Sequence, residues 1–334
     1  MAWTIAIVTP VLDDWMSFAV LVDEISNLFS GSEFAFHICA VDDGSNIPFD
    51  ADAIALPEAS CILSIEVIRL AANLGHQRAI AVGLCAIAES TEIDAVLVMD
   101  SDGQDRPIDI ALLLASGCRH PGHVVLAKRV KRSESYAFRA WYAVYRLLFH
   151  ALTGQPISFG NFCVIPIAAV RRLAHMPELW NNLAASIMRS RLSYTTVPTA
   201  RGDRLAGRSK MNLVSLILHG LTAMSVHTDT IFVRILLVAA FVAATAGFGI
   251  AAVVGIRTAT DLAIPGWATV AAGDLLIILL QTLVIVVVVT LTFLAGRSHR
   301  PFVPIVDCPP FVAHRERCRV RRHMVAPPRA APVQ

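Results

Sequence analysis

Short apolar stretches rich in β-branched residues recur along the first part of the chain, with helical stretches between them. They cover residues 4–11, 36–41, 65–70, 95–99 and 124–127. Strands that alternate with helices are typical of a mostly parallel sheet with helices on both of its faces. The pattern therefore predicts an α/β domain.

The pattern changes after about residue 227, where two long apolar runs follow. Residues 231–256 contain one charge, Arg234, and residues 268–295 contain one charge, Asp274. As a helix the first run would span roughly 39 Å, against a bilayer hydrocarbon core of roughly 30 Å. Neither run has the polar stripe of a soluble surface helix, so two transmembrane helices are favoured over two buried core helices.

These runs divide the chain into three parts. We expect a domain over residues 1–227 that includes amphipathic helices next to the membrane, a two-helix transmembrane hairpin over 228–296, and a basic cytoplasmic tail over 297–334. Residues 257–267 are too few to fold alone and would form the hairpin loop, with Trp267 as an interfacial anchor.

The basic residues give the orientation. The loop contains only Arg257, offset by Asp261, whereas the arginines cluster after the second run. They are Arg297, Arg300, Arg315, Arg317, Arg319, Arg321 and Arg322. By the positive-inside rule the domain and the tail share the cytoplasm, which predicts a multi-pass protein of the cell (inner) membrane. The tail arginines would either contact anionic lipid or be solvated.

Composition agrees with one soluble domain plus a small membrane unit, since 55% of the residues are hydrophobic and 16% are charged. The net charge of +2 gives no reason to expect nucleic acid as a partner. Seven cysteines form no C-x-x-C pair or zinc-site spacing, which indicates reduced thiols. Residues 1–8 lack a basic n-region and are expected to form a first strand instead of a signal peptide.

Acidic residues follow two of the predicted strands. Asp42 and Asp43 come directly after one strand, and Asp100 and Asp102 flank Ser101 after another. Ligands of α/β sheets bind at such carboxyl ends. Two carboxylates aimed at one point suit Mg²⁺ or Mn²⁺ bridging a diphosphate. An isolated D-x-D pair is equally compatible with a solvated acidic turn.

Three segments together carry a resemblance to a known family. Residues 10–14 read P-V-L-D-D, residues 42–45 read D-D-G-S, and residues 99–104 read M-D-S-D-G-Q. The chain resembles glycosyltransferase family 2 over nearly its whole length. It is most similar to the polyprenyl-phosphate sugar transferases related to dolichyl-phosphate mannose synthase and the bacterial bactoprenol glucosyltransferases, which add two C-terminal transmembrane helices. The resemblance implies a GT-A (Rossmann-like) domain.

The resemblance also implies roles for individual residues. The nucleotide side would include Pro10, Leu12, Asp14, Asp42, Asp43, Ser101, Gln104, Arg129 and Asn161. Asp100 and Asp102 would hold the metal and the diphosphate. Arg204 and Lys210, in an R-x-x-G-x-S-K segment, would contact phosphates as part of the catalytic set. A basic patch that only binds lipid headgroups is the alternative for this segment.

Two positions depart from the family pattern. Leu12 and Asp13 stand where the family usually has Tyr and Asn, which leaves the nucleobase open. Asn161 stands where related bacterial enzymes often have an Asp that is proposed as the catalytic base. A phosphate monoester, with a second pKa of about 6, is already anionic and needs no base. We therefore expect Asn161 to position the acceptor or donor, and Asp105 to serve as a fallback base or to support the metal loop.

The expected reaction is inverting, metal-dependent transfer of a hexose from a nucleotide-diphosphate sugar, with UDP favoured, to a polyprenyl phosphate at the bilayer surface. Transfer to a saccharide hydroxyl of a surface glycan is one alternative. A catalytically weak nucleotide-sugar-binding membrane protein is another. A homo-oligomer is left open.

Two further helical stretches are candidates for contact with the membrane. Aromatic residues share one helical face: Phe138, Trp141, Tyr142, Tyr145 and Phe149. This face would lie in the headgroup region or pack into a core. Residues 211–226 resemble a second interfacial helix. His76 forms no ligand spacing and is interpreted as a structural or surface residue. It follows a turn at Asn73-Leu74-Gly75 that resembles an N-x-G motif near the nucleotide pocket.

Overall fold

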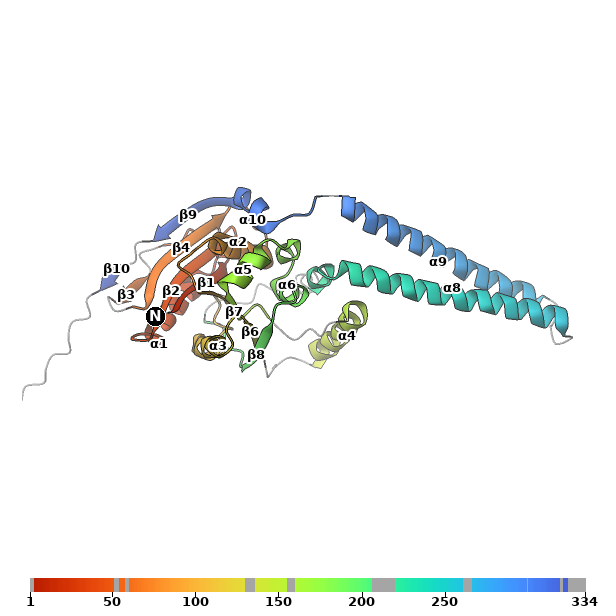
Figure 1. Cartoon of the computed structure of the whole chain (residues 1–334), viewed down its shortest axis with the longest axis horizontal. Coiled ribbons are helices and arrows are strands. Elements are labelled where there is room, and N and C mark those ends of the chain that lie inside the picture. Colours follow the sequence, from red (N-terminus) through yellow and green to blue (C-terminus); the bar gives the residue numbers. More distant parts are fainter. Residues whose placement is uncertain are drawn as a thin grey trace, which may run out of the picture. The chain divides into compact units, whose positions relative to one another are not determined.

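The computed structural model describes residues 3–50, 54–57, 60–129, 136–154, 160–205, 220–260, 266–298, 300–318 and 321–323. The chain divides into two compact units (Figure 1). One comprises Met1–Ala140, Ile157–Val226 and Phe302–Gln334, and the other comprises Trp141–Pro156 and His227–Pro301.

The first unit is built on an eight-stranded mixed sheet. Its strand order is β8 (Tyr194–Thr199), β6 (Val124–Arg129), β7 (Cys163–Pro166), β5 (Ala95–Val98), β1 (Trp3–Val11), β2 (Phe34–Asp42), β4 (Ile62–Leu70) and β9 (Val312–Cys318). The strands β5, β1, β2 and β4 are parallel, as are β6 and β8, whereas β7 and β9 run antiparallel to their neighbours. The α/β fold and all five predicted strands are confirmed.

Helices cover both faces of this sheet, as predicted. On one face α1 (Trp15–Leu28) and α3 (Pro107–Arg119) pack on a core that includes Ile7, whereas α2 (His76–Ala88) and α5 (Ile167–Ala174) pack on the other, with Val8. Both faces of β1 are buried, which explains its nearly continuous apolar sequence. Helix α2 approaches closely at Gly83, where an added Cβ would lie 2.6 Å from Val8 Cγ1.

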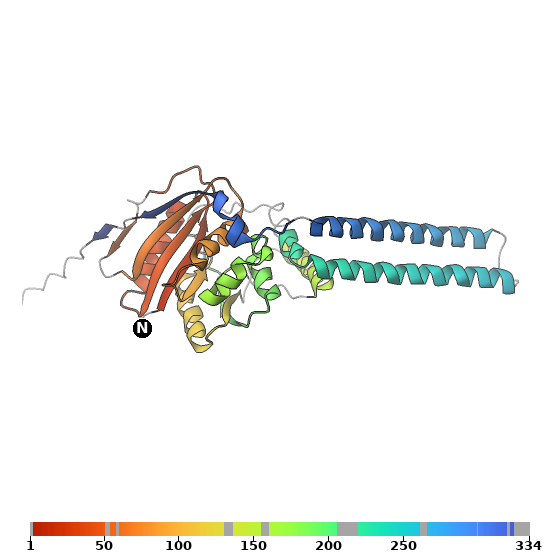
Figure 2. The ribbon, with the colours of Figure 1, turned by 45° about the horizontal axis from the view of Figure 1, so that its top comes forward.

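The segment after the second long helix differs from the predicted basic tail. It forms α10 (Pro304–Asp307), a 3₁₀ turn η3 (Pro309–Phe311) and β9, which pairs antiparallel with β4 (Figure 2). Cys308 is buried in the core. The arginines of this segment gave the appearance of a solvated tail, but charged side chains are also what protects an edge strand from pairing with another chain.

Aromatic contacts and a short pair of strands also attach residues 302–318 and 321–323 to the first unit. The Phe302 and Phe311 rings lie 4.3 and 5.4 Å from the ring of Trp180, the last residue of η2 (Pro177–Trp180). A second, two-stranded sheet pairs β10 (Arg321–His323) with β3 (Ala55–Pro57) in parallel. Residues 302–318 and 321–323 are therefore an integral part of the first unit.

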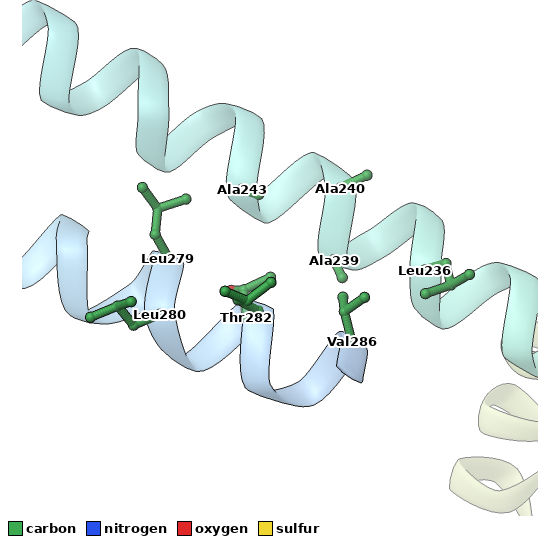
Figure 3. A pocket seen from close by; sticks show the side chains of 9 residues that line it. Leu236, Ala239, Ala240, Ala243, Leu279, Leu280, Thr282 and Val286 are labelled. Carbon is green, nitrogen blue, oxygen red and sulfur yellow. The ribbon is translucent and has the colours of Figure 1, made fainter. Parts of the chain in front are cut away.

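The second unit contains α8 (Thr228–Ala259) and α9 (Trp267–Ser298), two helices long and apolar enough to cross a membrane. Most of their large apolar side chains are exposed. The Phe232 and Phe293 rings stack at 4.1 Å, and alanines of α8 face leucines of α9 across an apolar groove (Figure 3).

Helix α4 (Tyr136–Thr153) enters this second unit. Phe149 is buried and its ring lies 6.0 Å from the His227 ring. The Arg234 guanidinium donates to the carbonyl of His150 at 3.1 Å, near the end of α4, where the helix dipole favours a cation. Of the aromatic face expected either in the headgroup region or in a core, Phe149 packs within the protein. Residues 220–225 are helical, and residues 211–219 of the second expected interfacial helix lie outside the described part.

The position of β9 in the sheet predicts slow proteolysis there. In limited digestion with trypsin, Arg315 and Arg317 should remain uncut while the domain is folded, because paired strand backbone does not enter a protease site. Mass spectrometry of the fragments, compared with a digest in denaturant, measures this protection. Cleavage at both arginines as fast as in the denatured chain would contradict the strand.

Candidate functional site

Polar residues gather where the parallel strands β1, β2 and β5 end. Because these strands are neighbours, Pro10, Asp42 and Asp100 come to the same edge of the sheet. The Ser101 hydroxyl donates to the Pro10 carbonyl at 3.2 Å and ties two of these loops together. Leu12 directly follows the last residue of β1 and so lies in the loop after that strand. The predicted convergence of these residues at one edge is therefore present.

Arg204 joins two carboxylates of this edge. Its Nη2 lies 3.0 Å from Asp14 Oδ2, and its Nη1 lies 3.5 Å from Asp102 Oδ2. Asp14 precedes α1 and also accepts a 2.6 Å hydrogen bond from Ser17 Oγ. Burial raises the pKa of Asp102, while the Gln104 N–H and Arg204 act to lower it. The arginine thus stabilises negative charge at the point where the sequence predicted a diphosphate site.

Residues 201–205 lie along the D-x-D loop. The Gly202 N–H donates to the Gln104 carbonyl and the Leu205 N–H to the Asp102 carbonyl, both at 2.9 Å. The Gln104 side chain accepts from Arg201 Nη2 at 2.6 Å. An added Cβ at Gly103 would lie 2.4 Å from Leu205 Cγ, so this approach requires glycine. These contacts explain how Arg204, which is distant in the sequence, comes to lie beside Asp102.

The buried Asp105 forms an ion pair with the half-buried Arg129 behind the D-x-D loop. Arg129 Nη2 donates to Asp105 Oδ1 at 2.9 Å, and the Asp100 N–H donates to Asp105 Oδ2 at 3.1 Å. Asp105 is 3% exposed, and burial, followed by the Asp100 charge, raises its pKa to about 7, although Arg129 acts to lower it. Of its two expected roles, these contacts favour support of the metal loop over that of a base. Arg129 lies at the end of β6 and holds Asp105 from there.

The carboxylates after β2 organise loops. Asp42 Oδ1 accepts from the Ser45 N–H at 2.7 Å, with Arg69 Nε 3.7 Å from its Oδ2. Asp43 Oδ1 accepts from the Leu74 N–H at 2.7 Å, and Asp43 Oδ2 from the Gly75 N–H at 3.0 Å. Burial raises the pKa of Asp43. Asp43, expected on the nucleotide side, is thus engaged in shaping the turn at residues 73–75.

Sequence reasoning missed a polar chain that links α2 to Asn161. His76 Nε2 lies 3.2 Å from Asp100 Oδ1 and 3.0 Å from Asn161 Nδ2. Gln77 Nε2 donates to Asn161 Oδ1 at 3.0 Å. Burial is the largest single effect and lowers the pKa of His76, but Asp100, Asp105 and Asp43 together raise it, so the net shift is upward. The available signal was position, since His76 and Gln77 directly follow the turn after β4.

The donor set determines what cation the site could hold. Asp100 and Asp102 supply hard carboxylate oxygens, and among the described residues no group of three or more His, Cys, Asp or Glu side chains is placed to hold a metal. Mg²⁺ typically takes one or two carboxylates and completes its shell with substrate phosphates and water. The two aspartates therefore fit a cation that arrives with a diphosphate. Lys210 lies outside the described residues.

Comparison with known protein families adds to this geometry. The model for glycosyl transferase family 2 matches residues 6–179, more than half of the chain. The chain belongs to glycosyl transferase family 2. The predicted enzyme class, a glycosyltransferase, is confirmed. The match runs from β1 to η2, and therefore includes the D-x-D loop and Asn161 but not Arg204 or the two long helices.

Similar proteins fall in the same class. The chain is 26% identical over 250 residues to the uncharacterized glycosyltransferase YkoT of Bacillus subtilis (strain 168), covering 72% of this chain and 68% of that protein. Glucosyl-3-phosphoglycerate synthase of Mycobacterium tuberculosis, solved with Mn²⁺, UDP-glucose and phosphoglyceric acid, is 19% identical with a TM-score of 0.45, covering 70% of this chain and 79% of that one. Mannosyl-3-phosphoglycerate synthase of Rubrobacter xylanophilus is 15% identical with a TM-score of 0.45, covering 67% and 72%.

Substitution Arg129→Met in this family 2 enzyme should destabilise the fold in a pH-dependent way. Arg129 acts to lower the pKa of Asp105, so its loss raises that pKa further above the unfolded value. At pH 8 the Asp105 carboxyl would then have to be protonated in the folded state, at a cost of about 1.4 kcal/mol, the value of the one pKa unit between about 7 and pH 8. At pH 5 the carboxyl is protonated and the loss should be small, as thermal unfolding in detergent at both pH values would show.

The double variant Arg129→Met/Asp105→Asn is the matched control. Because the amide carries no charge at either pH, much of the stability at pH 8 should return, and its pH dependence should disappear. A loss of equal size at pH 5 and pH 8 in the single variant would contradict the role assigned to the pair.

Proposed function

We propose that this enzyme transfers a hexose from a nucleotide-diphosphate sugar to a polyprenyl phosphate at the cytoplasmic face of a membrane, with inversion at the anomeric carbon. The observation that carries the proposal is the meeting of Asp100, Asp102, Asp14 and Arg204 at the strand-end edge of a family 2 domain. UDP is the favoured nucleotide.

The donor end of the site has the chemistry that a diphosphate requires. Asp100 and Asp102 would hold Mg²⁺ or Mn²⁺, which neutralises charge on the diphosphate leaving group. Arg204 lies beside Asp102 and carries charge that can pair with a phosphate oxygen when the donor binds. Pro10, Leu12, Asp14 and Asp42 come from the two loops next to this position and would border the nucleoside.

The attacking group is constrained by the absence of a carboxylate at position 161. Asn161 cannot take a proton, and Asp105 is buried and hydrogen-bonded to Arg129 and to the Asp100 N–H. A phosphate monoester attacks with an oxygen that is already deprotonated at neutral pH. A saccharide hydroxyl would lose the roughly 10²- to 10⁴-fold contribution that a positioned base gives. These residues support a phosphate acceptor.

The two apolar helices supply the reason for a lipid acceptor. Helices α8 and α9 are long enough to cross a bilayer, and β9, beyond α9, pairs in the same sheet as β1. Both ends of the hairpin are therefore attached to one folded domain, which an even number of crossings permits. The arginines that follow α9 favour the cytoplasm for that domain. A polyprenyl phosphate presents its headgroup at this surface.

Substitution Asp102→Asn should abolish transfer and leave insertion into the membrane unchanged. The amide keeps the size of the side chain but removes the charge that holds the cation, so we expect at least a hundredfold loss, roughly that of one charge-stabilising group in an active site. Membranes containing the enzyme would be incubated with Mg²⁺ or Mn²⁺, labelled UDP-sugars and GDP-sugars, and polyprenyl phosphate.

Asp203→Asn is the matched control, because Asp203 is an exposed carboxylate beside Arg204 and should tolerate the change. Labelled lipid from wild-type membranes supports the proposal. Label found only in a glycan would favour the saccharide-hydroxyl alternative, binding without turnover would favour a catalytically weak protein, and full activity of Asp102→Asn would remove the metal role.

A further inference from the structure

A chain of amide groups of fixed direction runs from a backbone N–H to the candidate site. The Leu183 N–H, at the first residue of α6 (Leu183–Arg189), donates to Gln77 Oε1 at 2.9 Å. Gln77 Nε2 then donates to Asn161 Oδ1 at 3.0 Å, and Asn161 Nδ2 lies 3.0 Å from His76 Nε2. The last contact lies next to Asp100, whose Oδ1 is 3.2 Å from the same nitrogen.

The backbone determines the direction of this chain. A backbone N–H can only donate, so Gln77 must present its oxygen to Leu183 and its nitrogen to Asn161. Asn161 must then present its oxygen to Gln77 and its nitrogen toward the site. Turning either amide by 180° would set two N–H groups against each other, within a region where Gln77 is 8% exposed. An unsatisfied buried donor costs about 1–3 kcal/mol, so the alternative orientation is disfavoured.

The backbone on both sides of the chain is also held firmly. Phe162 is buried and its carbonyl accepts from the Ala127 N–H at 2.9 Å, which fixes the backbone between Asn161 and β7. Gln77 lies in the first turn of α2, a helix packed on the sheet core. The Asn161 amide nitrogen is therefore presented to the site by secondary structure on both sides.

We infer that Asn161, oriented by Gln77, is a specificity-determining residue that selects an anionic phosphate oxygen over a neutral hydroxyl as the acceptor group. This inference rests on the proposed function and names the group its acceptor must carry. Asn161 Nδ2 carries two hydrogens, and His76 Nε2 accepts at most one of them, or none when its own N–H faces Asp100 Oδ1. The second hydrogen can donate to an acceptor phosphate.

The charge of the acceptor decides how much this contact contributes. A hydrogen bond to a charged group contributes more than one between neutral groups, and an N–H donor gives no help in removing a proton from a hydroxyl. A carboxylate at position 161 would do the opposite, since it accepts from Gln77, repels a phosphate and can take a hydroxyl proton. The direction of the amide chain thus distinguishes the two acceptor classes.

Gln77 is a positioning residue, and Gln77→Glu separates this role from a structural one. The carboxylate can still accept from the Leu183 N–H, so α6 keeps its N-terminal partner. It cannot donate to Asn161, which should turn and present Oδ1 to the site. The variant therefore reverses the direction of the chain while leaving its anchoring contact in place.

The test uses the full-length enzyme in detergent and compares wild type with Asn161→Ala, Asn161→Asp and Gln77→Glu. Steady-state kinetics gives KM separately for polyprenyl phosphate and for the UDP-sugar or GDP-sugar that the wild type uses. We expect KM for polyprenyl phosphate to rise roughly tenfold to a hundredfold in Asn161→Asp and Gln77→Glu, and less in Asn161→Ala, with KM for the donor unchanged. Equal changes in both KM values, or an unchanged KM for polyprenyl phosphate in Asn161→Asp, would overturn the inference.

Calorimetric binding of farnesyl phosphate and farnesol, without any donor, separates this inference from the proposed function. Tighter binding of the phosphate by wild type, lost in Asn161→Asp and Gln77→Glu, supports the inference even if no sugar is transferred to lipid. In that event only the proposed function fails. If sugar is transferred to polyprenyl phosphate but farnesyl phosphate and farnesol bind equally tightly to the wild type and to every variant, the proposed function stands and the role of Asn161 is rejected.

Discussion

Compensation of carboxylate charge at the strand-end edge of the sheet is the constraint on which the rest of this structure depends. A carboxylate removed from water is costly unless a cation or N–H donors lie against it. Arg204 lies between Asp14 and Asp102, and Arg129 lies against Asp105. These arginines come from distant parts of the chain, so their ion pairs also hold the segments that carry them at the site. A donor diphosphate with its cation would therefore bind at an edge where arginines already compensate carboxylate charge.

The sheet provides the geometry of the site, and the two long helices are an insertion in the sequence of the unit that contains it. Parallel strands β5, β1 and β2 bring their carboxyl ends together, and helices on both faces bury those strands. The two long helices are inserted between residues 227 and 302, after which β9 returns to the edge of the same sheet. Both flanks of the hairpin therefore belong to the same unit.

Much of the fold followed from local patterns, and what did not has physical reasons. Apolar β-branched runs predicted the central strands, and the rule that ligands meet strand ends located Asp42 and Asp100. Strand β8 was missed because Tyr194–Thr199 is polar and half-exposed, and β9 because its arginines resemble a solvated tail. His76 and Gln77 were missed as site residues because Asn161, their partner, lies more than eighty positions away. Local periodicity contains no information about such long-range contacts, although the motif resemblance assigned Arg204 and Asp102 to the same diphosphate site.

Nucleotide binding without turnover tests the central claim most directly, because it depends on the carboxylate edge and not on the acceptor. Calorimetric titration of the full-length enzyme with UDP and with GDP, in the presence of Mn²⁺ and again in the presence of EDTA, would measure it. We expect one nucleotide, UDP by preference, to bind only when the cation is present. In Asp100→Asn this cation-dependent binding and the preference between UDP and GDP should both be lost. Binding of equal strength with and without the cation, or none for either nucleotide, would contradict the assignment of the edge as a diphosphate site.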